Sequence, residues 1–230
     1  MTFLKLLSLV AVVAITGCSV AAQKPVALNE EAFTQTNSIA IIATEVPTPD
    51  TTFPGASCLI CAGIAIANHS ALTEKVVTFS TEELVSLPED LKQVLAESGK
   101  QVVISDKPLV LKSLPDSKSK LENSSKKDFS GLAKELGVSK ALVIDVQFDG
   151  VLREYSSGYI PAAAPVGYVY GYAYLVNPET SQYEWFMPLN IREAVEGEWD
   201  EPADFPKLTN AYYSAVEKFR DAVLNAFTAK

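Results

Sequence analysis

The chain has 230 residues, which suits one domain with a sizeable core, and 48% of them are hydrophobic, which excludes an intrinsically disordered protein. Its formal net charge of −9 argues against nucleic acid as a partner and against electrostatic docking on anionic lipid. Protein and glycan partners remain open.

The N-terminal segment has the pattern of a secretory signal: Lys5 supplies a positive charge, residues 6–15 are almost all apolar, and Gly17 and Cys18 follow. The apolar run is too short to span a bilayer, which needs roughly 20 residues. The ending Ile15-Thr16-Gly17-Cys18 resembles the lipobox of bacterial lipoproteins. This resemblance implies cleavage after residue 17 and a covalent lipid, including palmitate, on Cys18. An ordinary signal peptide with an incidental Cys18 is the alternative.

The residue after Cys18 is Ser19 and not Asp. By the same resemblance, this favours a lipid-anchored protein of the outer membrane that faces the periplasm. Residues 18–36 are mostly polar or small and show no clear period, so we expect a tether there. A single α/β periplasmic domain is then expected over 37–230.

The first half of this domain is predicted to alternate strands with helices. Short apolar runs bounded by polar residues indicate the strands, and apolar residues at helical spacing after serine capping boxes indicate helices. In chain order we expect a strand over 38–43, a loop over 44–57, a small-residue helix over 58–71, a helix from about Ser80 to Gly99, a strand over 101–105, a loop over 107–127 and a short helix after Asp128.

The second half changes character, because apolar and polar residues alternate strictly. Three alternating stretches lie at 140–155, 166–176 and 182–191, joined by a Pro/Ala loop and a turn. They predict an antiparallel meander with one solvated face. A single apolar stripe over 208–227 predicts the final helix.

The element order β-α-α-β-α-β-β-β-α predicts an α/β (α+β) fold with a mixed sheet, an antiparallel three-stranded C-terminal meander and helices packed on one face. This order resembles that of the TolB amino-terminal domain and of the curli-secretion lipoprotein family. The stretches 53–61 and 199–212 are similar to those of uncharacterised lipoproteins of Gram-negative bacteria. The resemblance implies a location in the envelope and no particular activity.

Cys58 and Cys61 are a pair at CxxC spacing in a compartment that is expected to be oxidising. They predict a short-loop disulfide or a pair of buried thiols. The order of strand, loop, CxxC and helix also resembles thioredoxin-like oxidoreductases, so thiol-disulfide exchange is an alternative function. Zinc would need a fourth ligand beyond Cys58, Cys61 and His69, so we expect no metal site.

Two carboxylates, Asp145 and Asp149, are predicted to share one face of a strand with Gln147. Their spacing of about 13 Å along the strand is too long for the paired carboxylates of a glycosidase. We therefore expect a solvated sheet face there, and we identify no catalytic residue.

Aromatic residues form a ladder in the meander. Tyr168, Tyr170, Tyr172 and Tyr174 alternate with small residues, so all four are expected on one face of the sheet. The next strand adds Tyr183 and Trp185 with a shared parity, which predicts one continuous aromatic face. Tyrosine and tryptophan are enriched where partners bind, although cross-strand pairing alone also explains such a ladder.

These observations together predict a membrane-anchored envelope lipoprotein that acts as a non-enzymatic accessory or scaffold. We expect the bilayer as its first partner, through the anchor on Cys18. An envelope protein is expected as its second partner, through the aromatic face. We expect no nucleic acid partner and no cofactor other than the covalent lipid.

Overall fold

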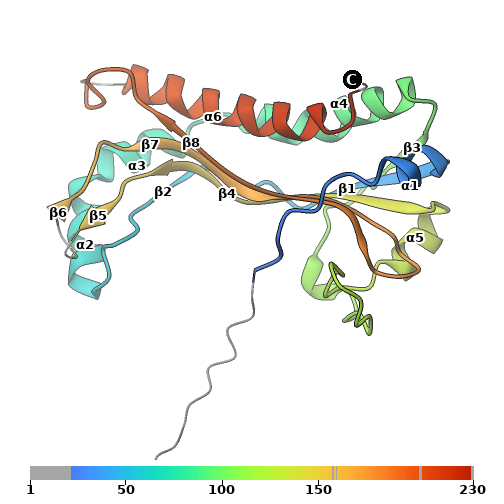
Figure 1. Ribbon diagram of the computed structural model, residues 1–230. Helices are drawn as coiled ribbons and strands as arrows, with labels where there is room; N and C mark the ends of the chain where they lie inside the picture. The colour runs from blue at the N-terminus through green and yellow to red at the C-terminus, as the bar shows by residue number, and fades with distance from the viewer. Residues whose placement is uncertain (1–21, 157, 159, 202–203, 229–230) are drawn as a thin grey trace, which may run out of the picture.

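The computed structural model describes residues 22–156, 158, 160–201 and 204–228. Figure 1 shows the main sheet on edge, with two long helices on one side and shorter segments on the other side and at one end. The expected signal segment and Cys18 lie outside the described residues. Within those residues, no helix combines the length and the apolar character needed to cross a membrane.

The main sheet is mixed, and its strands follow the order β3-β1-β4-β7-β8, with β2 paired to β4. Strand β1 pairs in parallel with β3 and with β4, and β2 pairs in parallel with β4. Strand β7 pairs antiparallel with both β4 and β8. The expected C-terminal meander is therefore confirmed. The strands are β1 (Ser38–Ala43), β2 (Asp50–Thr52), β3 (Gln101–Ile104), β4 (Lys140–Leu152), β7 (Val166–Val176) and β8 (Tyr183–Ala194), and β5 (Tyr155–Ser156) and β6 (Ile160–Pro161) form a separate hairpin.

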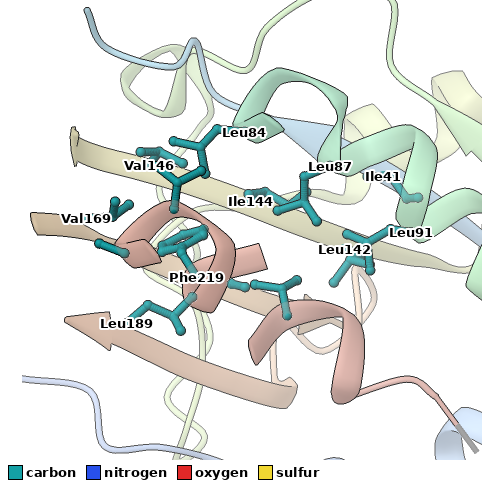
Figure 2. Close-up of a cluster of buried hydrophobic side chains, with 14 of the residues drawn as sticks. Ile41, Leu84, Leu87, Leu91, Leu142, Ile144, Val146, Val169, Leu189 and Phe219 are labelled. Carbon is teal, nitrogen blue, oxygen red and sulfur yellow. The ribbon is translucent and has the colours of Figure 1, made fainter. Parts of the chain in front are cut away.

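The two long helices, α4 (Glu82–Glu97) and α6 (Pro206–Asn225), cover one face of the sheet. Figure 2 shows Leu84, Leu87 and Leu91 of α4 pointing at the buried side chains of β4, with Phe219 of α6 beside them. All four of these side chains are at most 2% exposed. Burial of such side chains contributes about 1.5–3 kcal/mol each, so this layer makes a large contribution to stability.

A third helix, α5 (Ser130–Leu136), corrects the expectation that the helices pack on one face only. The buried residue before it, Phe129, belongs to a second apolar cluster on the opposite side of the sheet, with Ala141 and Val143 of β4. Strand β1 is buried along its centre because it lies between these two layers.

The segment predicted as one helix over 58–71 forms two helices, α2 (Leu59–Asn68) and α3 (Ser70–Val76). The break is at His69, whose backbone leaves the helical region at φ −121° and ψ 24°. The second helix buries Leu72 and Val76 in the main core. Most of α2 is exposed.

The expected tether over 18–36 is wrong over its second half, because that part is docked on the domain. Val26 exchanges two backbone hydrogen bonds with Phe186 of β8, at 2.9 and 3.0 Å. Asn29 then caps the six-residue helix α1 (Glu30–Gln35), which buries Phe33 against the core. A helix this short shows no recognisable period in the sequence, which is why pattern reasoning missed it.

The ammonium group of Lys100 holds α1 in place. It donates hydrogen bonds to the carbonyl oxygens of Phe33, Thr34 and Thr36 at 2.7, 3.1 and 2.8 Å, and it lies 4.8 Å from the centre of the Phe33 ring. The Phe33 carbonyl also accepts a 3.1 Å hydrogen bond from the backbone N–H of Thr36, the C-cap residue. All three carbonyls lie at the C-terminal end of α1, where the helix dipole favours a cation.

We predict that Lys100→Met, which keeps the apolar stem but removes the three donors, loosens α1. The backbone amides of residues 30–36 should exchange hydrogen faster, and the free energy of unfolding should fall by about 2 kcal/mol. The matched control is Lys92→Met, because Lys92 makes only a 3.5 Å surface ion pair with Glu89. Unchanged exchange in the Lys100 variant would show that α1 is held by Phe33 alone.

Candidate functional site

The candidate site is the part of the sheet that lies opposite α6. Strand β7 places Gly167, Val169 and Ala173 against the helix layer, so the residues between them point to the other face. Tyr168 and Tyr170 are among these residues, and each is half-buried. None of the described helices lies over this part of the sheet (Figure 1).

The aromatic rings here form a continuous row that begins on β4 and runs along β7. Phe148 of β4 lies 5.3 Å from Tyr168, Tyr168 lies 6.4 Å from Tyr170, and Tyr170 lies 5.5 Å from Tyr172, measured between ring centres. The hydroxyl groups of Tyr170 and Tyr172 are hydrogen-bonded to each other. We call these four residues the tyrosine row.

One cation lies at the end of the tyrosine row. The guanidinium of Arg192 on β8 lies 5.4 Å from the centre of the Tyr168 ring and donates a 2.6 Å hydrogen bond to Glu154. Two exposed neighbours on the same strand, Pro188 and Asn190, pair with the row tyrosines. The site therefore offers rings with polar tips beside an exposed arginine.

The hydroxyl groups of Tyr168 and Tyr172 are neutral at physiological pH, because both have a raised pKa. The hydrogen bond with Tyr170, followed by burial, raises the pKa of Tyr172 to about 12. Burial also raises the pKa of Tyr168. Nearby, Asp145 accepts from Thr44 at 3.2 Å and from Gln147 at 3.0 Å. Tyrosine side chains bind a partner through the contact area of the ring and through hydrogen bonds of the hydroxyl group.

Trp185 does not join this face, and the expectation that it does is wrong. A bulge in the pairing of β7 with β8 makes Trp185 pair with Leu175, while Tyr183 pairs with Val176, so the two aromatic residues point to opposite faces. Trp185 is 3% exposed and packs on Phe227 in the helix layer.

The remaining predicted residues, Tyr174 and Tyr183, lie on the expected side but are largely covered. Tyr174 is 6% exposed, with the ring of Phe129 at 6.2 Å. Tyr183 packs on Tyr174 and Phe186. Sequence reasoning missed Phe186, which continues the row from Tyr172 at 5.6 Å, because the bulge that turns it to this face leaves no sequence signal.

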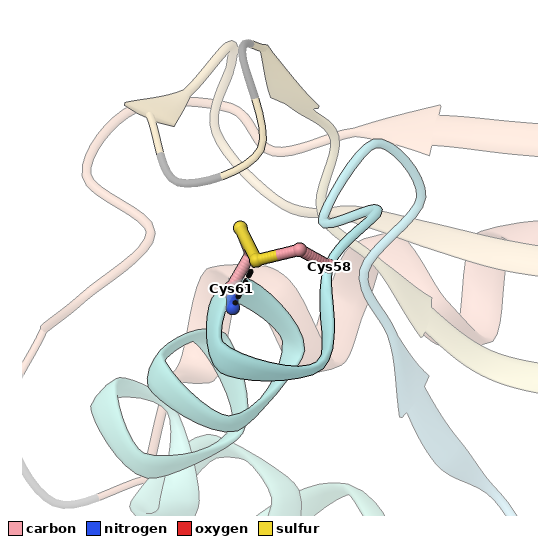
Figure 3. The surroundings of a disulfide bond; sticks show 2 residues. All are labelled: Cys58 and Cys61. Carbon is pink, nitrogen blue, oxygen red and sulfur yellow. Dashed lines mark hydrogen bonds between the residues drawn. A yellow bond between two sulfur atoms is a disulfide. The ribbon is translucent and has the colours of Figure 1, made fainter.

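Cys58 and Cys61 form a disulfide with their Cα atoms 4.9 Å apart. Figure 3 shows the bond in the first turn of α2, where the Cys58 Sγ also accepts a 2.9 Å hydrogen bond from the backbone N–H of Cys61. Oxidised sulfurs are not zinc ligands. Among residues 22–156, 158, 160–201 and 204–228, no three His, Cys, Asp or Glu side chains are grouped to hold a metal ion.

His69 belongs to an aromatic cluster at the other end of α2. Its Nε2 is hydrogen-bonded to the hydroxyl of Tyr155 at 2.9 Å, and its ring stacks on Phe53 at 5.4 Å. Burial, followed by the charge of Arg153, lowers the pKa of His69. The histidine is therefore a neutral structural partner that links α2 to β5.

The expected solvated pair of Asp145 and Asp149 is wrong. A bulge between Val146 and Phe148 on β4 inserts one residue, which turns Asp149 toward α6 while Asp145 stays on the tyrosine side. Asp149 is 1% exposed, and it accepts a 2.9 Å hydrogen bond from the hydroxyl of Tyr212. Burial raises the pKa of this carboxyl to about 7, although the hydrogen bonds lower it.

Comparisons with known proteins assign no family. No family model matches the chain, and no curated protein matches it. Among solved structures it is similar to a lipoprotein from Neisseria meningitidis, at 16% identity and a TM-score of 0.31, over 82% of this chain and 96% of that one. It is also similar to a homologue of the neuraminyllactose-binding hemagglutinin from Helicobacter pylori, at 10% identity and a TM-score of 0.38, over 85% and 84% of the two chains.

A third similar structure is the C-terminal domain of LpoB from Salmonella enterica, at 14% identity and a TM-score of 0.21, over 69% of this chain and 84% of that one. Bacterial lipoproteins are thus among the similar structures. With TM-scores below 0.5, these likenesses assign no function to this chain. The narrower likeness to the TolB and curli-secretion proteins stays a prediction.

We predict that the buried Asp149 makes stability fall as pH rises. Between its ordinary pKa of 3.8 and the folded value of about 7, the unfolded chain loses this proton while the folded chain keeps it. The free energy of unfolding should therefore fall through this window, by on the order of 2–4 kcal/mol.

Denaturant unfolding at a series of pH values measures the effect. Asp149→Asn should remove this part of the pH dependence and be more stable than the wild type at pH 8, because an amide is never ionised there. The control Asp106→Asn alters an exposed loop carboxylate and should follow the wild-type curve. Parallel curves for Asp149→Asn and the wild type would contradict the raised pKa.

Proposed function

We propose that this protein is a lipid-anchored accessory or scaffold protein of the bacterial envelope, which binds an envelope protein through the tyrosine row. The observation that carries the proposal is the row itself: three half-buried tyrosines and one phenylalanine in continuous ring contact, with Arg192 at one end. Tyrosine and arginine are enriched among residues that dominate binding energy at protein interfaces.

The chemistry of the row supports binding. The hydroxyl groups of Tyr168 and Tyr172 are neutral phenols, and the two charged groups at the Tyr168 end, Arg192 and Glu154, already pair with each other. Rigid rings lose little conformational entropy when a partner binds, and each tyrosine carries a polar tip for hydrogen bonding.

The proposed anchor brings the row close to a bilayer. Cys18 is four positions before Ala22, so their Cα atoms are at most about 14 Å apart. Because the chain is docked from Val26 onward, the domain has little freedom to move away from the membrane. A partner in or near the same membrane is therefore at high local concentration.

A second candidate function is thiol-disulfide exchange at Cys58 and Cys61. The observation that favours it is the position of Cys58, exposed at the N-cap of α2, where a helix N-terminus stabilises a thiolate. The variant with both cysteines changed to Ser distinguishes the two functions. If the protein is an accessory protein, this variant keeps its partner crosslinks. If the protein is a redox enzyme, the variant loses that activity and the envelope substrates stay reduced.

We predict that a palmitate analogue labels the wild-type protein and fails to label Cys18→Ser. The labelled protein should be recovered with the outer-membrane fraction, because several acyl chains hold a protein firmly on a bilayer. An unlabelled wild-type protein that is found in the cytosol would overturn the anchor and the proposed location.

We also predict that a photocrosslinker placed at Asn190, beside the row, captures an envelope protein in cells. Tyr170→Ala combined with Tyr172→Ala should reduce this crosslink at least about tenfold, because interface tyrosines commonly contribute more than 1 kcal/mol each. The matched control is Tyr213→Ala, which removes a partly exposed tyrosine from α6 on the other side.

The corresponding double change to Phe keeps both rings and removes only the hydrogen bond between the hydroxyl groups. It should fold like the wild type and lose part of the crosslink. Crosslinks that survive the double Ala change in a folded protein would remove the tyrosine row as the binding surface.

A further inference from the structure

Helix α2 exposes its large apolar side chains, whereas an ordinary surface helix buries them. Its large aliphatic side chains point outward: Leu59 is 95% exposed, Ile60 75%, Ile66 57% and Ile64 45%. The residue that it buries is small, since Ala65 is fully covered. At 3.6 residues per turn, the outward aliphatic positions span about half of the helix circumference. Water is a poor environment for such a surface.

The stretch of sequence that contains α2 carries no charged side chain, and the charge of Arg153 acts on His69 at the C-terminal end of the helix. No Asp, Glu, Lys or Arg occurs between Thr51 and Thr73, in a chain whose net charge is −9. The neighbouring β5–β6 hairpin lies in a second uncharged stretch, from Tyr155 to Pro178, and it exposes 48% of Ile160. A Cβ atom at Gly158 in this hairpin would lie 3.0 Å from the Sγ of Cys61, so the two elements are in contact. We call α2 and this hairpin the apolar end.

The apolar end lies on the side of the sheet from which the chain leads toward its N-terminus. In Figure 1, α2 extends past the sheet on the side opposite α4 and α6, as do the dark blue N-terminal segment and the green segment before α5. That green segment, residues 105–129, holds six lysines against four acidic residues. This segment therefore has a net charge of +2, although the whole chain has a net charge of −9.

Three occupants could cover α2: a protein partner, a second copy of this chain or a lipid bilayer. A protein interface has a polar rim around its apolar centre. The exposed residues of α2 include no such rim, because they are all Leu, Ile, Gly or Ala except Asn68 at the last position. A bilayer offers hydrocarbon to the helix and anionic headgroups to the lysines. The short span between Cys18 and Ala22 also brings that bilayer within reach.

We propose that the apolar end inserts into the interfacial layer of the bilayer that holds the N-terminal anchor, and that it forms a second attachment point for the domain. This inference rests on the anchor of the proposed function. Ten residues of helix span about 15 Å, half of the hydrocarbon thickness, so α2 enters the bilayer surface without crossing it. Two attachment points fix the orientation of the domain, whereas one tether would let it rotate.

The disulfide fits this role. Insertion exposes the first turn of α2 to a medium in which unpaired backbone N–H groups are costly. Cys58 accepts from the N–H of Cys61, and the bond between the two sulfurs closes the turn around Leu59 and Ile60. The most exposed aliphatic pair is thereby presented on a rigid turn.

The experiment uses the full chain in vesicles of phosphatidylethanolamine and phosphatidylglycerol whose acyl chains carry bromine, a quencher of tryptophan fluorescence. Ile60→Trp reports from the tip of α2, and Ile66→Trp reports from a second outward position. The matched control is Val85→Trp, at a side chain of α4 that is 61% exposed on the other side of the sheet. The fluorescence of wild-type Trp185 and Trp199 is subtracted.

We expect the bromolipid to quench the indoles introduced by Ile60→Trp and Ile66→Trp at least about twofold more than the one introduced by Val85→Trp. Equal quenching in all three variants would overturn the insertion. Blue-shifted emission from the Ile60→Trp variant without quenching would also overturn it, because α2 would then be covered by protein, including a second copy of the chain.

Palmitate labelling of the same samples separates this inference from the proposed function. A labelled protein without quenching in the Ile60→Trp variant overturns the insertion and leaves the anchor. An unlabelled protein with quenching overturns the anchor and leaves the contact between α2 and lipid. The crosslinks at the tyrosine row are measured independently of both.

Discussion

The close packing of α6 on β7 decides which side chains this protein buries and which it exposes. Gly167 leaves so little space that a Cβ atom there would lie 2.3 Å from the carbonyl oxygen of Ala211 in α6. The other buried residues of β7 with the same parity as Gly167 are Val169, Gly171, Ala173 and Leu175, none of them aromatic. Because a strand alternates its faces, the large tyrosines between these residues have to point the other way. One strand thus creates the buried core on one face and the tyrosine row on the other.

Two bulges then decide which residues reach each face. The bulge on β4 sends Asp149 into the helix layer, where its carboxyl is buried against Tyr212. The bulge opposite Val176 separates Tyr183 from Trp185 and admits Phe186 to the aromatic face. A shift of one residue reverses the exposure of everything that follows it, so these two irregularities determine the content of the site.

The side of the molecule that bears the tyrosine row combines an apolar region with a lysine-rich one. An uncharged helix with outward aliphatic residues lies at one end, lysines lie in the segment 105–129, and the chain leads from this side toward its N-terminus. If the apolar end inserts as proposed, the row is held at a fixed angle to the membrane. The proposed partner would then be met in one orientation, which reduces the entropy lost on binding.

The α/β class, the antiparallel meander, the final helix and the shared face of Tyr168, Tyr170 and Tyr172 could be predicted from the order of residues, because hydrophobic period and turn residues are local signals. Three features came from the folded arrangement alone: residues 26–35 dock on the domain, Trp185 and Asp149 are buried in the helix layer, and α2 lies outside the core. These features depend on the two bulges, on the contact between Lys100 and α1, and on which elements pack against each helix. Such contacts join positions far apart in the chain, and no local pattern of residue types encodes them.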